Sequence, residues 1–312
     1  MSGPENILAA LGSEIENYEE EVFSLFCHNL PSQSLGFIDK SATLLEVTIG
    51  NHDFLIHQSP TILSSDRGGG TTGAVIWKVS SLFATWISQT SNLLFRNAIL
   101  NSKSSVLELG CGISGINALA LRSLVEKYIL TDQIYVMKLL NQNLEENCTT
   151  SPAQASNKKK MSKNFNNQKK NIKFSRPINY TSNISTITLD WEFDDITHKL
   201  GDVSQHQGFD LVLACDCIYN DALIQPFVNS CSDACKIRSQ GNVTPTICII
   251  AQQLRSSDVF ESWLKSFGQN FIVWRIPDSE LIEELRIGSG FVVHLGILKQ
   301  TTFITNYKNR PK

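Results

Sequence analysis

From about residue 105 to residue 298, short apolar runs alternate with segments of helical periodicity. The segments at 116–127, 136–147 and 256–267 have helical periodicity, and another follows residue 215. Strands that alternate with helices pair in parallel through right-handed crossovers. The pattern therefore predicts an α/β fold: a Rossmann-like, mostly parallel sheet of about seven strands with helices on both faces. The expected strands are 106–109, 128–132, 184–190, 209–215, 246–251, 271–276 and 290–298.

The pattern before residue 105 is different and predicts an extension packed on that core. An amphipathic helix is expected over 5–29, with apolar positions Leu8, Leu11, Ile15, Tyr18, Val22 and Phe26 at helical spacing. Residues 43–58 alternate around Asn51 as a strand pair does. A glycine- and threonine-rich loop at 68–73 precedes a helix expected at about 75–90. We therefore divide the chain into residues 1–104, a core at 105–298 and a polar tail at 299–312.

One long segment interrupts the core. Residues 148–182 are rich in Asn, Ser and Lys, and between residues 147 and 182 there are seven lysines, one arginine and no acid. Such a composition predicts a disordered or mobile basic insertion. A weak contact with RNA or a ribosome is one interpretation, and a solvated linker without a partner is the more common one.

The net charge of the chain is very different with and without this basic segment. The net charge is -3, but the insertion carries +8, which leaves -11 on the rest of the chain. An acidic body favours encounter with a basic partner and disfavours bare nucleic acid. The sequence contains no signal of the oligomeric state, so a monomer is the default expectation.

The eight cysteines include no CxxC pair, and no Cys/His spacing fits zinc, so we expect free thiols and no metal. Free thiols are typical of a reducing compartment. The acidic N-terminus resembles no signal peptide, and no apolar run reaches membrane-spanning length. These features indicate a cytoplasmic location, with the nucleus also open.

Candidate chemistry lies where the strands end, because ligands of parallel sheets bind at their carboxyl edge. The turn Gly110-x-Gly112-x-x-Gly115 lets backbone approach a ligand, and both dinucleotide enzymes and S-adenosylmethionine enzymes use such a turn. Glu108 favours the second class, since a carboxylate suits an amino-acid ammonium group and repels a pyrophosphate.

The residues that end the next two strands can accept hydrogen bonds from a ligand. Asp132 can accept two ribose hydroxyls, which both classes require. Asp190 can accept from an adenine amine, and Trp191 beside it is either a flat wall for the base or plain core packing.

Asp216 ends a buried apolar strand, and Tyr219 follows three residues later. A carboxylate in such a place is costly unless it has a function or a partner. It could orient an amine for methyl transfer beside an aromatic wall that suits a cationic product. The alternative is an Asp that caps the next helix.

Taken together, these motifs resemble the class I, seven-β-strand protein lysine methyltransferases of the methyltransferase-like 21 type, especially the fungal ribosomal lysine methyltransferase 5 group. The resemblance covers residues 43–298. The strings that carry it are Thr72 to Trp77, Val106 to Gly112, Leu130 to Asp132, Leu189 to Trp191, Asp216 to Tyr219 and Gln253 to Arg255.

The resemblance implies S-adenosylmethionine as cofactor, held by Trp77, Gly110, Cys111, Gly112, Asp132, Trp191 and Cys215. It also implies that Asp216 and Tyr219 handle a substrate lysine, with a basic large-subunit ribosomal protein as the expected partner. The basic insertion and the Ile113-Ser114 pair depart from the wider family, which leaves the substrate open.

Three alternatives remain open at this point. The first is an RNA or small-molecule methyltransferase of the same fold, which the absence of an Asn-Pro-Pro-aromatic string disfavours. The second is an inactive module that binds a partner, and the third is a nicotinamide oxidoreductase.

Overall fold

A single mixed sheet forms the centre of the molecule. The computed structural model describes residues 4–28, 30–31, 36–66, 70–149, 183–201, 208–238 and 244–299. In these ranges seven strands pair in the order β5-β4-β3-β6-β7-β9-β8, and only β9 runs antiparallel to its neighbours. The mostly parallel seven-stranded sheet is therefore confirmed. The strands are β3 (Ser105–Leu109), β4 (Lys127–Asp132), β5 (Ile184–Thr188), β6 (Leu211–Cys215), β7 (Ile247–Gln253), β8 (Phe271–Arg275) and β9 (Phe291–Leu298).

The strand order creates a crevice in the middle of this sheet. The chain leaves β3 toward β4 on one side and returns to β6 on the other. At such a switch point the connections diverge above the carboxyl ends of the strands and leave room for a ligand. The glycine turn after β3 and Asp216 after β6 both lie at this crevice.

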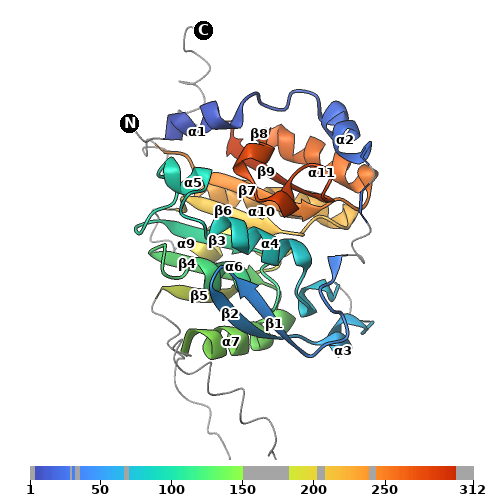
Figure 1. Ribbon diagram of the computed structural model, residues 1–312, viewed down its shortest axis with the longest axis vertical. Helices are drawn as coiled ribbons and strands as arrows, with labels where there is room; N and C mark the ends of the chain where they lie inside the picture. The colour runs from blue at the N-terminus through green and yellow to red at the C-terminus, as the bar shows by residue number, and fades with distance from the viewer. Residues whose placement is uncertain are drawn as a thin grey trace, which may run out of the picture.

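Helices cover both faces of the sheet, as the alternation predicted (Figure 1). One face packs against α1, α4, α5, α6 and α7, and the other against α2, α9, α10 and α11. Strand β6 shows why, since Leu211 and Leu213 face the first layer while Val212 and Ala214 face the second. The helices are α1 (Pro4–Leu11), α2 (Tyr18–Phe26), α3 (Pro60–Leu63), α4 (Lys78–Ile87), α5 (Leu93–Arg96), α6 (Ile116–Leu121), α7 (Ile134–Thr149), α9 (Ile196–Gly201), α10 (Asp221–Lys236) and α11 (Ser257–Asn270).

The single helix predicted over 5–29 is wrong, because the segment forms two helices, α1 and α2. Gly12 has a left-handed φ of 76°, which ends α1. Asn17 then caps α2 by accepting hydrogen bonds from the Glu19 and Glu20 amides. Between them the Ile15 amide donates to the Val273 carbonyl at the edge of β8. Figure 1 shows both helices at the same end of the molecule as β8, β9 and α11.

The strand pair predicted at 43–58 is confirmed as the hairpin of β1 (Leu44–Ile49) and β2 (His52–His57). Two asparagines of α7 hold it. Asn143 accepts from the His57 amide and donates to its carbonyl, both at 2.8 Å, and Asn147 does the same with Leu55 at 2.9 and 2.8 Å. The two side chains thus satisfy the backbone of β2 as a neighbouring strand would.

Several predicted boundaries move, and some predictions fall outside the described residues. The helix expected at 75–90 spans only Lys78–Ile87, and that expected at 116–127 ends at Leu121 so that β4 can begin at Lys127. Residues 150–182 and 300–312 are not described, so the predicted insertion and tail remain predictions. The division at residue 104 also remains a prediction, although α1, β1 and β2 share the apolar cluster of the sheet. None of the described helices is both long and apolar enough to span a membrane.

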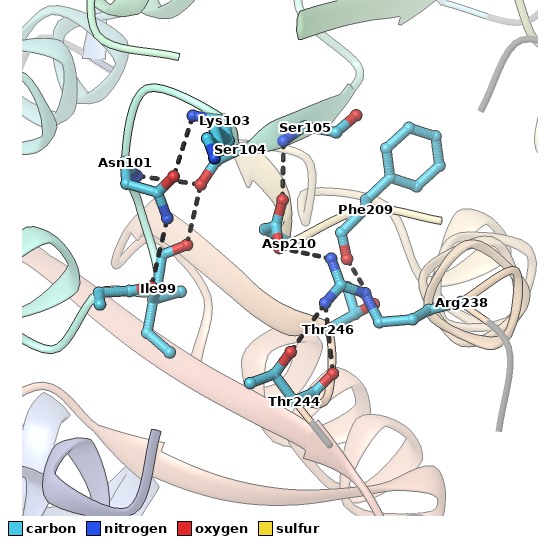
Figure 2. Close-up of polar contacts among 11 residues, drawn as sticks. Ile99, Asn101, Lys103, Ser104, Ser105, Phe209, Asp210, Arg238, Thr244 and Thr246 are labelled. Carbon is cyan, nitrogen blue, oxygen red and sulfur yellow. Dashed lines mark hydrogen bonds and ion pairs between the residues drawn. The ribbon is translucent and has the colours of Figure 1, made fainter. Parts of the chain in front are cut away.

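The amino edge of the sheet, opposite the crevice, is closed by a polar network around Asp210 (Figure 2). Its carboxylate accepts from the Ser105 amide at 2.8 Å and from Arg238 at 2.5 Å. Arg238 also donates to the carbonyl and the hydroxyl of Thr244. The network ties the start of β3 to the residue before β6, to Arg238 after α10 and to Thr244 before β7.

We expect Asp210→Ala to lower the free energy of unfolding by about 2–3 kcal/mol, because it leaves a buried guanidinium and a backbone amide without their acceptor. Urea denaturation measures this. Asp233→Ala is the matched control, since its ion pair with Lys236 is largely exposed and should contribute about 0.5 kcal/mol or less. Equal losses in the two variants would contradict a structural role for the network.

Candidate functional site

An open pocket of about 780 Å³ lies at the carboxyl ends of β3, β4, β5 and β6. The segment from Thr72 to Ser80 covers it from the other side. Of the residues predicted to form the site, all but Glu108 line this pocket: Trp77, Gly110, Cys111, Gly112, Asp132, Asp190, Trp191, Cys215, Asp216 and Tyr219.

The turn after β3 forms one wall of the pocket. Two independent features of the structure require a glycine at the first position of this turn, Gly110. Gly110 has a φ of 67°, which favours glycine. A Cβ there would also lie 2.7 Å from the Cys217 sulfur and 3.0 Å from the Trp191 ring. Gly112 has a similar φ, but a Cβ there would come no closer than 3.5 Å to any neighbouring atom. Side chains therefore pack directly against the backbone at Gly110, whereas a Cβ at Gly112 would only make ordinary contact with the Gly73 backbone.

Asp132 stands at the end of β4 with its carboxylate at the pocket. One oxygen accepts from the Gly112 amide and the other from the Gln133 amide, both at 2.7 Å. Burial raises the pKa of Asp132 to about 6, although both amides act in the opposite direction. The group is a carboxylate at neutral pH, with one lone pair left on each oxygen for a ligand.

Glu108 lies behind the turn instead of in the pocket. Its two oxygens accept from the Asn117 amide at 2.8 Å and from the Tyr128 hydroxyl at 2.6 Å. Burial raises its pKa to about 7, against the effect of both hydrogen bonds. The expected contact with a ligand ammonium group is untested, and this geometry favours a supporting role beneath the turn.

Two tryptophans form opposite walls. Trp77 donates from its ring nitrogen to the Thr72 carbonyl at 3.0 Å and stacks on Phe37 with ring centroids 4.6 Å apart. Trp191 packs on Phe227 at 5.0 Å and keeps one side toward the pocket. Phe37 supports the Trp77 ring and Phe227 supports the Trp191 ring, and both tryptophans also line the pocket.

Asp216 occupies a strained and almost completely buried place. It has a φ of 60°, unusual for a residue other than glycine, and its side chain is 2% exposed. Asn220, not Asp216, caps α10 by accepting from the Ala222 amide. The helix-cap alternative for Asp216 is therefore wrong.

The partner of Asp216 is Arg255, which no pattern of residue types singled out. The guanidinium donates to both carboxylate oxygens at 2.5 Å. It also lies over the Trp77 ring, 5.2 Å from its centroid. The only sequence signal was its place in the Gln253-Leu254-Arg255 string. The ion pair joins the ends of β6 and β7.

Tyr219 lies at the mouth of the pocket, with its side chain partly exposed. Its hydroxyl accepts a hydrogen bond from the Thr72 hydroxyl at 3.1 Å, and burial raises its pKa. A smaller hollow of about 300 Å³ lies on the other side of the ring, with Arg255 and Gln252 in its wall. Tyr219 therefore separates the main pocket from a second opening to the surface.

The three thiols of the pocket are poor nucleophiles. Cys111, Cys215 and Cys217 are all buried, and burial raises the pKa of each well above its usual value. Within the described residues, no three or more His, Cys, Asp or Glu side chains are arranged to hold a metal ion. The chemistry of the pocket is thus that of carboxylates, aromatic rings and backbone amides.

The chain is similar to several known proteins. A family model described as lysine methyltransferase matches residues 56–164 and 158–266. Ribosomal lysine N-methyltransferase 5 of Kluyveromyces lactis is 28% identical over 289 residues, which cover 80% of this chain and 87% of that protein. The protein of the same name from Zygosaccharomyces rouxii is 31% identical over 235 residues, or 69% of this chain and 70% of that protein.

A third relative is longer than this chain. The Schizosaccharomyces pombe protein named diaminohydroxyphosphoribosylamino-pyrimidine deaminase is 29% identical over 282 residues, which cover 90% of this chain but 57% of that protein. The chain thus spans just over half the length of that relative.

Among solved structures, an O-methyltransferase family protein from Burkholderia thailandensis aligns with a TM-score of 0.40 at 11% identity, over 71% of this chain and 56% of that one. An rRNA methylase from Streptococcus thermophilus aligns with a TM-score of 0.37 at 11% identity, over 72% of this chain and 99% of that one.

Proposed function

The chain belongs to the lysine methyltransferase family, and on that premise we propose that it methylates the side-chain amine of a lysine in another protein. The resemblance identified from the sequence motifs is confirmed by the family model and by relatives that cover most of the chain. S-adenosylmethionine is the methyl donor of the reaction. The observation that carries the proposal is that one pocket joins a set of cofactor-type groups to the Asp216 carboxylate and the Tyr219 ring.

The residues of the pocket fit S-adenosylmethionine. Gly112 lines the pocket, and the Asp132 carboxylate has lone pairs for the two hydroxyls of a ribose. Asp190 and Trp191 offer an acceptor and a flat face to an adenine, and Trp77, Cys111 and Cys215 complete the walls. When bound, the cofactor supplies an electrophilic methyl group on a sulfonium, whose C–S bond breaks as the new C–N bond forms.

We expect the affinity for S-adenosylmethionine to fall as the pH drops below about 6, by up to about tenfold for each pH unit. The ribose hydroxyls need the ionised form of Asp132. Because the pKa of Asp132 is about 6, that form is complete above pH 7 and lost below pH 5. Calorimetry between pH 5 and pH 8 measures the dependence.

The Asp132→Asn variant distinguishes this group from Glu108, whose pKa of about 7 lies in the same window. The variant keeps one acceptor oxygen and cannot titrate, so its affinity should be weaker and nearly independent of pH. If the variant retains the full pH dependence of the wild type, Asp132 is not the group responsible.

On the substrate side, the chain's own residues can orient an amine. Asp216 can accept one of its hydrogens, which points the nitrogen lone pair away from the carboxylate. The Tyr219 ring offers a face to the methylated, cationic product.

A ribosomal protein is the substrate class that we propose. Two observations support it: relatives named ribosomal lysine N-methyltransferase cover most of the chain, and the chain outside the basic segment carries a net charge of -11, which suits a basic target.

Mass spectrometry of ribosomal proteins from cells with and without the gene tests this substrate. We expect one lysine to lose a modification of roughly 14 Da for each methyl group, with the charge of the amine retained. An unchanged ribosome would contradict the proposed substrate class and leave the lysine proposal to be tested on other proteins.

A further inference from the structure

We propose that Arg255 is a positioning residue that makes the Asp216 site select a neutral amine over an ammonium ion. This inference rests on the proposed function, since it concerns how the substrate lysine is handled. A buried carboxylate next to the substrate amine poses a problem for methyl transfer. A lone buried carboxylate would bind a lysine as its ammonium form, and an ammonium nitrogen has no lone pair with which to accept a methyl group.

The hydrogen bonds of Asp216 limit what it can still accept. A carboxylate has about four lone-pair positions. On Oδ1, both are used, by Arg255 at 2.5 Å and by the Gln253 amide at 3.3 Å. On Oδ2, Arg255 uses one. A single position therefore remains, and it can hold one hydrogen of an amine in one direction.

The charge of the pair has a second consequence. The guanidinium neutralises Asp216 at close range, so the carboxylate no longer attracts an ammonium ion strongly. Arg255 is itself held in place, over the Trp77 ring and by a 3.0 Å hydrogen bond to the Gln253 side chain. An incoming ammonium ion would meet this fixed positive charge, which favours loss of its proton to solvent before methyl transfer.

The other ionisable groups near Asp216 do not change this preference for a neutral amine. Tyr219, Cys215 and Cys217 have pKa values raised by burial and are neutral at physiological pH. Asp132 and Glu108 lie at the cofactor side, on the ends of β4 and β3. Arg255 is thus the cation that directly contacts Asp216 among the described residues.

The experiment is a pH profile of initial rates, from pH 6.5 to pH 10, with total ribosomal protein from cells lacking the gene as acceptor and S-adenosylmethionine at saturation. We expect Arg255→Gln to raise the apparent pKa of the rising limb by about one pH unit or more. Its rate should fall about tenfold or more at pH 7.5 and recover to within about threefold of wild type near pH 10.

Two further variants make the result specific. Arg255→Lys keeps the positive charge but not the paired geometry, so it should keep the wild-type midpoint with a lower plateau. Arg275→Gln, which removes an arginine that pairs with Glu21 away from the pocket, should leave the profile unchanged. Calorimetry should show that Arg255→Gln keeps its cofactor affinity, and melting curves should show that it still unfolds cooperatively, at a lower temperature because the buried Asp216 loses its ion-pair partner.

An equal loss of rate at every pH in Arg255→Gln would overturn the inference and leave Arg255 a structural residue. An unchanged profile would overturn it as well. A wild-type protein that methylates no lysine would be a different failure, since it removes the proposed function and with it the role of Arg255.

Discussion

Asp216→Ala is expected to abolish methyl transfer, with a loss of about 10³-fold or more, while S-adenosylmethionine binds within about threefold of its wild-type affinity. We assign the carboxylate, which lines the pocket, to the substrate side, so its loss should remove the acceptor that orients the amine. A loss of this size corresponds to about 4 kcal/mol of transition-state stabilisation. Rate measurements and calorimetry on the same preparation test both parts.

Two control variants separate the loss of the Asp216 carboxylate from other effects of the substitution. Asp216→Asn keeps a side chain that tolerates the φ of 60° and should also lose transfer. Asp221→Ala changes an exposed carboxylate in the first turn of α10 and should retain activity. If cofactor affinity falls as steeply as the rate in Asp216→Ala, Asp216 belongs to the cofactor site and the assignment is wrong.

The second large effect is expected at Gly110, where alanine should reduce cofactor affinity by about 30-fold or more. The new Cβ would overlap with the Cys217 sulfur and the Trp191 ring, so the turn or the tryptophan wall must move. It also forces alanine into a left-handed φ, which costs roughly 1 kcal/mol. Calorimetry gives the affinity, and urea denaturation gives the change in the free energy of unfolding.

Gly50→Ala is the matched control for backbone strain alone. Gly50 has a φ of 58° in the β1–β2 turn, and a Cβ there meets no atom within 4 Å. It should lose about 1 kcal/mol of stability and bind the cofactor normally. Normal cofactor binding by Gly110→Ala would show that the turn is not part of the cofactor site.

Much of the fold could be predicted because the periodicity of the core is strong. The central parallel strand β6 is buried along its whole length and reads as an unbroken apolar run from Leu211 to Cys215. The residues that follow these strands meet at one edge of the sheet for purely topological reasons. That is why the sequence alone predicts that Asp132, Trp191 and Asp216 lie at one pocket, as they do.

The remaining features depend on contacts that periodicity does not encode. Arg255 comes to Asp216 only because β7 pairs beside β6, and the sequence gives the strands but not their neighbours. Glu108 was expected to contact the cofactor; its two oxygens accept hydrogen bonds from Asn117 and Tyr128 beneath the turn, and a contact with a ligand stays a prediction. The helical period of residues 5–29 continues through Gly12, where the chain turns to meet β8.

The account depends most directly on one claim, that this pocket moves a methyl group from S-adenosylmethionine to a lysine amine. The decisive measurement incubates the purified chain, and in parallel its Asp216→Ala variant, with isotopically labelled S-adenosylmethionine and ribosomal protein from cells that lack the gene. Digestion and mass spectrometry then locate the label. The account predicts labelled methyl groups on the side-chain nitrogen of lysine with the wild type and none with the variant. Label on RNA or on another side chain, or equal labelling by the two proteins, would contradict it.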